Sequence, residues 1–148
     1  GVYHEYIRCI KRVLPGRCNF WFSSKLFPGF QRIFTWIFAE GRVAVHKDSQ
    51  SYIETRVGLG KAVGTPDIVI RVSGKEKYKI IIIENKMGAT EGKEQTVRYE
   101  SSEAKQRIVS RYGLDIDEID FHYVYLALDK TVKPINTKFV FLDYNIFL

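Results

Sequence analysis

The fold of this chain is decided by two neighbouring segments, Gly64-Thr-Pro-Asp-Ile-Val-Ile70 and Ile80-Ile-Ile-Ile-Glu-Asn-Lys86. Each contains a run of β-branched residues, which favours an extended strand. The residues between them, Ser73-Gly-Lys-Glu-Lys77, are polar and include a glycine, which is typical of a turn. The sequence therefore predicts a β-hairpin made of residues 68–72 and 80–83.

The open end of this hairpin carries three charged side chains. Asp67 comes just before the first strand, and Glu84 and Lys86 follow the second. If the strands pair without a bulge, Asp67 lies directly opposite Glu84, with Cβ atoms about 4.5–5.5 Å apart. Side chains alternate along a strand, so Lys86 lies on the same face as Glu84. We therefore expect two carboxylates and a lysine to cluster at this end.

Two carboxylates at this separation repel each other unless a cation lies between them. Oxygen ligands without a nearby histidine are typical of Mg²⁺ or Mn²⁺ rather than zinc. Such a metal lowers the pKa of water and polarises a phosphoryl oxygen. A neighbouring lysine can orient or deprotonate the water, or stabilise negative charge on the phosphoryl group. The alternative interpretation is an ordinary salt-bridge cluster at the surface, because Pro-Asp and Glu-x-Lys are each common.

The spacing of these residues is also that of a known family signature. Pro66-Asp67 followed by Glu84-Asn85-Lys86 resembles the signature of the PD-(D/E)xK nuclease superfamily. That superfamily, also called restriction-endonuclease-like, includes Holliday-junction resolvases and RecB-type nuclease domains. Gln95 and Tyr99 form a Gln-x-x-x-Tyr pattern, similar to an element on the helix after the catalytic hairpin in RecB-like members. The resemblance covers roughly residues 40–128.

This resemblance implies a restriction-endonuclease-like core and a metal-dependent deoxyribonuclease, in which metal-activated water attacks a DNA phosphodiester bond. Asp67 and Glu84 would be ligands of Mg²⁺ or Mn²⁺, and Lys86 would be the catalytic lysine. Gln95 and Tyr99 would help to position the site or the DNA. From the residues alone, Tyr99 could equally be an aromatic at the edge of the core and Gln95 a solvated side chain.

The residues after the hairpin predict a long helix. Residues 91–112 are rich in helix formers, with Thr90 as N-cap and Gly113 as the stop. The apolar stripe of this helix is formed by Val97, Ala104 and Ile108. Because Gln95 and Tyr99 are four residues apart, they share a face near the start of the helix, close to the end of the catalytic strand.

Many nucleases of this kind carry one more acidic residue, and here the sequence leaves its identity open. Glu40 ends an amphipathic helix predicted over residues 30–40, which has Gly41 as its stop. Glu54 lies in a predicted strand, and Glu5 lies in an earlier helical segment. Each could instead be a surface carboxylate, so the number of metal ions stays open.

The charge of the chain is concentrated at its N-terminal end. The net charge is +6, and the first 32 residues contain six basic residues but only one acidic residue. Aromatic residues such as Trp21 and Phe27 lie among them, which suits a surface that binds phosphates and stacks on bases. A basic helix face with an aromatic plug for the core is the alternative. The candidate DNA-binding residues are Arg8, Lys11, Arg12, Arg17, Lys25 and Arg32.

Composition excludes several classes of protein. At 148 residues the chain predicts a single domain, 1–148, with a real core, and 45% hydrophobic content excludes a disordered chain. No uncharged run approaches a membrane span, and no signal-peptide pattern opens the chain. Cys9 and Cys18 lack the spacing of a zinc site or a disulfide framework. We therefore expect an intracellular location, cytoplasmic or nuclear.

The element order predicts an α/β fold with a mixed β-sheet flanked by helices. The expected helices cover 3–14, 30–40 and 91–112, an aromatic loop covers 15–29, and an acidic connector covers 115–120. In addition to the hairpin, the expected strands cover 42–47, 52–57, 121–128 and 138–142. A strand–helix–strand order at the end implies a parallel pair of strands with a right-handed crossover.

Function is constrained less tightly than fold. A non-catalytic nucleic-acid-binding module on the same fold is the main alternative to a nuclease, although the intact Asp67, Glu84 and Lys86 set argues against it. A protein–protein adaptor is a third, distinguished by binding that is insensitive to salt. Symmetric cleavage of duplex DNA would favour a homodimer. The Gly at the start and the apolar residues at the end suggest a domain from a longer protein, whose specificity module would lie elsewhere.

Overall fold

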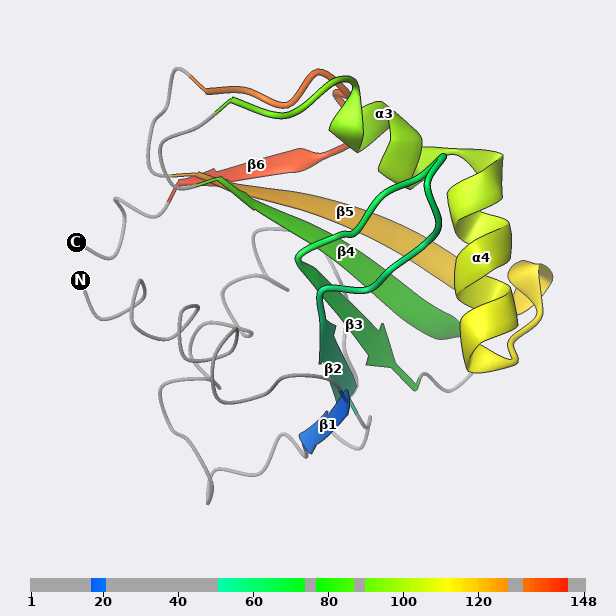
Figure 1. The fold of residues 1–148 in the computed structure, drawn as a ribbon. Helices are drawn as coiled ribbons and strands as arrows, with labels where there is room; N and C mark the ends of the chain where they lie inside the picture. Colours follow the sequence, from blue (N-terminus) through cyan, green and yellow to red (C-terminus); the bar gives the residue numbers. More distant parts are fainter. Residues whose placement is uncertain (1–16, 21–50, 74–76, 87–89, 128–131, 144–148) are drawn as a thin grey trace.

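The computed structural model describes residues 17–20, 51–73, 77–86, 90–127 and 132–143 (Figure 1). Within them, six strands form one sheet whose spatial order is also their order in the chain. The strands are β1 (Arg17–Phe20), β2 (Ser51–Thr55), β3 (Ile68–Val72), β4 (Tyr78–Lys86), β5 (Ile119–Ala127) and β6 (Val140–Asp143). The helices are α3 (Gln95–Glu100), α4 (Ser102–Tyr112) and the short 3-10 helix η1 (Ile116–Glu118).

The sheet is mixed, as an α/β fold with a restriction-endonuclease-like core requires. Strands β1 to β4 run antiparallel to their neighbours, whereas β5 and β6 are each parallel to the strand before them. A parallel pair needs a crossover connection, and α3, α4 and η1 supply it between β4 and β5. The prediction of a parallel pair around a helical connection is therefore confirmed.

The hairpin of β3 and β4 has the predicted register. Ile68 pairs with Ile83, and Val72 pairs with Lys79. Strand β4 is buried on both faces, since Ile80, Ile81, Ile82 and Ile83 each expose none of their surface. A run of four isoleucines suits such a central strand, because β-branched side chains pack well on both sides of the pleat.

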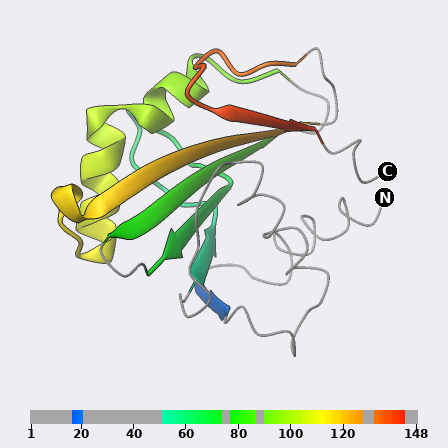
Figure 2. The ribbon, with the colours of Figure 1, turned by 180° about the vertical axis from the view of Figure 1, so that it is seen from behind.

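Helices α3 and α4 cover one face of this sheet, together with the connection between β2 and β3 (Figures 1 and 2). Tyr99 of α3 and Ile108 of α4 share a core cluster with Ile82 of β4. Val57 and Val63 of the β2–β3 connection belong to the same cluster. This core fixes the start of α3 above the open end of the β3–β4 hairpin.

The single helix predicted over residues 91–112 is wrong in two respects. It starts four residues later, at Gln95, and it is broken at Ser101, whose extended backbone (ψ 160°) separates α3 from α4. The Ser101 hydroxyl accepts a hydrogen bond from Ala104 N–H and acts as the N-cap of α4. The buried residues of α3 are Thr96 and Tyr99, so Val97 lies outside the expected apolar stripe and is 42% exposed.

Other boundaries differ in smaller ways. The predicted stop at Gly113 is confirmed, since Gly113 has φ 63° and ends α4. The predicted connector 115–120 instead contains η1 and the first residues of β5. Part of the predicted aromatic loop 15–29 is strand β1, which forms because its backbone pairs with β2. The helices expected over 3–14 and 30–40 and the strand expected over 42–47 lie outside the described residues.

Candidate active site

The carboxylates of Asp67 and Glu84 meet at the open end of the β3–β4 hairpin. Ile68 pairs with Ile83, so the next residues outward in the same register are Asp67 and Glu84. The backbone N–H of Asn85 donates a hydrogen bond of 2.9 Å to Oδ2 of Asp67. The predicted juxtaposition of the two acids is therefore present, and main-chain contacts hold it.

Glu84 is the more deeply placed of the two acids. It is 3% exposed, and its Oε1 lies 3.3 Å from Nζ of Lys86, whereas Oε2 is buried without a partner among the described residues. Burial and then the charge of Asp67 raise the pKa of Glu84 to about 8, although Lys86 opposes the shift. Such a site carries excess negative charge when both acids are ionised, and a cation would relieve it.

Gln95 and Tyr99 lie on the first turn and a half of α3 and bond to each other. Nε2 of Gln95 donates to the Tyr99 hydroxyl at 2.7 Å. Tyr99 is 1% exposed, and burial and then the charge of Glu84 raise the pKa of its hydroxyl. The structure thus brings this pair next to Glu84, as their spacing predicts, and neither side chain is simply solvated.

The connection between β2 and β3 supports the site from the other side. Its backbone folds back on itself, with Arg56 N–H bonding to Asp67 O at 2.8 Å and Leu59 N–H bonding to Gly64 O at 2.9 Å. Gly64 has φ 108°, and a Cβ atom there would lie 3.1 Å from Arg98 Nη1 and 3.4 Å from Tyr99 Cε1. Glycine is therefore required where this connection passes α3.

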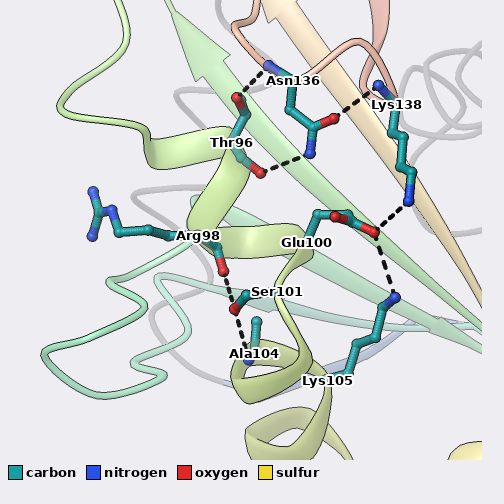
Figure 3. A network of polar contacts seen from close by, with 8 residues as sticks. All are labelled: Thr96, Arg98, Glu100, Ser101, Ala104, Lys105, Asn136 and Lys138. Atoms are coloured by element: carbon teal, nitrogen blue, oxygen red, sulfur yellow. Dashed lines mark hydrogen bonds and ion pairs between the residues drawn. The ribbon is translucent and has the colours of Figure 1, made fainter.

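A polar network around Thr96 anchors the start of α3 (Figure 3). Glu91 accepts hydrogen bonds from the Thr96 N–H and hydroxyl, each at 2.9 Å, and from the backbone N–H of Ile135. Asn136 donates from its backbone to the Thr96 hydroxyl at 3.0 Å and from its side chain to Thr96 O at 3.4 Å. These contacts tie the β5–β6 connection to α3 and so help to position Gln95.

The junction of α3 and α4 carries a second group of charges. Glu100 lies 2.9 Å from Lys138 Nζ and 3.5 Å from Lys105 Nζ (Figure 3). The Ser101 hydroxyl also donates to Arg98 O at 2.7 Å, which closes α3. This group lies at the opposite end of α3 from Gln95 and serves the helix junction.

An open cleft of about 560 Å³ lies beside this junction and along the first half of β5. Strand β6 pairs with β5 only from Val124 onward, so the preceding residues of β5 border the cleft. Its lining includes Glu100, Lys105, Phe121, Tyr123, Lys138 and Val140. None of the residues that line it belongs to the predicted catalytic set.

Of the three candidates for an additional acidic residue at the site, the structure describes only Glu54. Glu54 is buried, and its carboxylate accepts hydrogen bonds from Arg111 at 2.7 and 3.1 Å and from the Tyr112 hydroxyl at 3.1 Å. It therefore fastens α4 to β2. Glu40 and Glu5 lie outside the described residues.

The donor atoms at the site suit a hard divalent cation. Among the described residues, no group of three or more His, Cys, Asp or Glu side chains could hold a metal ion. Two carboxylates alone are typical of Mg²⁺, which keeps several water ligands and dehydrates reluctantly. The raised pKa of the Glu84 carboxyl, caused by burial and by the charge of Asp67, agrees with a cation bound at this position.

Other predicted site residues fall outside the described part. Arg8, Lys11, Arg12, Lys25 and Arg32 are among them. Arg17 is the first residue of β1, where its backbone pairs with Glu54.

Within the described residues, no helix is long and apolar enough to cross a membrane.

Sequence reasoning missed several contributors to the site. Glu91 was expected inside a helix, yet it lies before α3 and holds its first turn through Thr96. Gly64 offered a signal, because a glycine shortly before a strand often marks a close backbone approach. No sequence motif indicates that Tyr125 lies beside Glu84. The two residues are neighbours only because β5 pairs with β4.

Comparison with known proteins finds a family whose model matches this chain. The family model described as the PD-(D/E)XK nuclease superfamily matches residues 52–140, which is more than half of the chain. The match runs from β2 to the first residue of β6 and includes the whole carboxylate site. No curated protein and no solved structure matches the chain.

Proposed function

Because this chain belongs to the PD-(D/E)XK nuclease superfamily, we propose that it is a metal-dependent deoxyribonuclease that hydrolyses phosphodiester bonds. Members of this superfamily are usually nucleases, so the membership indicates a nuclease-type function. The choice of DNA as substrate and of Mg²⁺ or Mn²⁺ as cofactor is part of the proposal. One observation carries it: Asp67 and Glu84 are opposed in the hairpin register, with Lys86 3.3 Å from Glu84.

In this proposal Asp67 and Glu84 would hold the metal ion. When bound, the ion would lower the pKa of water and polarise a phosphoryl oxygen. The Asn85 N–H fixes Oδ2 of Asp67, and the hairpin backbone fixes the depth of Glu84. Preorganised ligands of this kind need little rearrangement when the ion and the substrate bind.

Lys86 would act on the phosphoryl group itself. Its side chain is only 16% exposed, so its charge is little screened by solvent. An ammonium group in this position can donate to a phosphate oxygen and stabilise the negative charge that develops there in the transition state. Gln95 and Tyr99, which are joined by a hydrogen bond, would help to hold Glu84 or the DNA in place.

DNA contacts beyond the scissile phosphate are proposed for the basic N-terminal segment. Its excess of positive charge supports this role, because neutralising phosphates releases counterions and gives binding that weakens steeply with salt. DNA affinity should therefore fall with salt concentration, and charge-reversing changes in this segment should reduce the slope. The residues concerned are Arg8, Lys11, Arg12, Arg17, Lys25 and Arg32.

Metal binding can be tested without any substrate. Calorimetric titration with Mg²⁺ and Mn²⁺ should show binding to the wild type, weakened more than about 100-fold in Asp67→Asn, since even changes outside the ligand shell cost about 10–100-fold. Asp117→Asn, which removes an exposed carboxylate of η1, should bind as the wild type does. A wild type that binds neither ion, while binding DNA in a salt-sensitive way, would indicate the non-catalytic module instead.

A further inference from the structure

Three polar atoms beside the carboxylate pair are buried and have no hydrogen-bond partner among the described residues. They are Oε2 of Glu84, Oε1 of Gln95 and the hydroxyl oxygen of Tyr125. An unpartnered buried polar atom costs about 1–3 kcal/mol, so native proteins seldom keep three close together without a reason.

The fold brings the three residues to the same place. Tyr125 is the register partner of Glu84 across the parallel strands β4 and β5, and both side chains lie on the face covered by α3. Gln95 is held above this face by its hydrogen bond to Tyr99. Burial and then the charges of Glu91 and Glu84 raise the pKa of Tyr125 to about 12, which agrees with a hydroxyl that lies near both carboxylates.

The hydrogen bonds that neighbouring groups already make limit which atoms can bind the Tyr125 hydroxyl. Both oxygens of Glu91 accept hydrogen bonds from Thr96, and one also accepts from Ile135 N–H. Glu84 Oε2 and Gln95 Oε1 have accepted none. The Gln95 oxygen and the oxygen of an ionised Glu84, the form that would bind a metal ion, can only accept, whereas the hydroxyl can donate. A water molecule that donates to the two acceptors and accepts from the hydroxyl satisfies all three, and three such bonds are typical of buried water.

We propose that Tyr125 is a positioning residue, whose hydroxyl holds the Glu84 carboxylate through one buried water molecule shared with Gln95. The inference rests on the proposed role of Glu84 as a metal ligand. Fixing Oε2 restricts rotation of the carboxylate, so that Glu84 meets the metal ion in one orientation. Groups that orient a ligand in this way typically contribute about 10–100-fold to metal affinity.

Tyr123 provides a matched control on the same strand. Its side chain lies on the same face of β5, it is 7% exposed, and its hydroxyl is also buried without a partner among the described residues. Tyr123 borders the cleft at the helix junction, where Glu100 is the charge that affects its hydroxyl. Removing either hydroxyl makes the same chemical change, but only Tyr125 is the register partner of Glu84, whereas Tyr123 pairs with Ile82.

The test compares Tyr125→Phe with Tyr123→Phe. Mg²⁺ affinity, measured by calorimetry, should weaken by about tenfold in Tyr125→Phe and should not change in Tyr123→Phe. The Mg²⁺ concentration for half-maximal DNA cleavage should rise by about the same factor in Tyr125→Phe, whereas kcat at saturating Mg²⁺ and KM for DNA should stay near wild type. Equal Mg²⁺ affinity in Tyr125→Phe and the wild type would overturn the inference.

A metal-free measurement separates this inference from the proposed function. If the wild type binds neither Mg²⁺ nor Mn²⁺, the proposed function fails, and urea unfolding of the metal-free proteins then decides the inference. A bridged hydroxyl predicts a lower urea midpoint for Tyr125→Phe than for Tyr123→Phe. A Tyr125→Phe midpoint equal to or above that of the wild type would show an unbridged hydroxyl and would overturn the inference, because deleting an unsatisfied polar group costs nothing.

Discussion

The backbone N–H of Asn85 donates a hydrogen bond of 2.9 Å to Oδ2 of Asp67. This bond joins the residue after Glu84 to the carboxylate opposite Glu84, so the two acids are locked across the hairpin. Their mutual repulsion is therefore not relieved by side-chain rotation alone. It appears instead in the pKa of Glu84, which burial and the charge of Asp67 raise to about 8.

The stability of the metal-free protein should fall as the pH rises from about 4.5 to about 8. In this range an unfolded glutamate has lost its proton, whereas Glu84 in the folded protein retains it. The unfolded state therefore binds fewer protons, and the free energy of unfolding decreases with pH. We expect a contribution on the order of 2–4 kcal/mol, measured by urea unfolding at several pH values.

Two substitutions test whether Glu84 is the group that causes this pH dependence of stability. Glu84→Gln should remove this contribution to the pH dependence, and Asp67→Asn should reduce it, because the charge of Asp67 is the second cause of the shift. Saturating Mg²⁺ should restore stability to the wild type at pH 8. A Glu84→Gln protein with the same pH dependence as the wild type would show that Glu84 is not the titrating group.

Gly64→Ala should destabilise the protein by about 1–3 kcal/mol and reduce cleavage. Its φ of 108° disfavours alanine, and the added Cβ atom would press on Arg98 and Tyr99. The measurement is the urea midpoint together with the cleavage rate. Gly58→Ala is the control, since a Cβ atom there meets nothing within 4 Å, and it should change stability by less than about 1 kcal/mol. Equal effects of the two substitutions would contradict the close approach at Gly64.

Glu54→Gln should lower stability by about 1–3 kcal/mol without changing Mg²⁺ affinity. The substitution keeps the shape of the side chain but removes the charge that Arg111 and Tyr112 bind. Glu103→Gln, at an exposed pair with Arg107, should change stability by less than about 0.5 kcal/mol. Loss of Mg²⁺ binding in a folded Glu54→Gln protein would instead make Glu54 the additional acidic ligand.

Local sequence rules predict the β3–β4 hairpin and its register well. Two apolar runs around one polar turn allow a single bulge-free register that buries Ile80 to Ile83, so the opposition of Asp67 and Glu84 follows from counting residues. The end of α4 at Gly113 is predictable for a similar reason, because few residues other than glycine adopt its left-handed backbone. These features depend on neighbours in the chain.

Features that depend on tertiary contacts could not be predicted in this way. Residues on both sides of Ser101 favour a helix, so only packing against the sheet reveals the break and the exposure of Val97. Glu91 suits a helical interior by propensity, yet it is used to bond Thr96. Predicting what lies beside Tyr125 requires knowing which residue of β4 it pairs with. The sequence pattern of a single strand does not show this pairing.

The most direct test of the account is Mg²⁺- and Mn²⁺-dependent cleavage of linear, circular, single-stranded and branched DNA by the wild type and by Lys86→Ala. Lys79→Ala, at the other end of β4, is the control. We predict metal-dependent cleavage that falls on the order of 10²–10⁴-fold in Lys86→Ala and persists in Lys79→Ala, with both variants folded. Undiminished cleavage by Lys86→Ala would contradict the account.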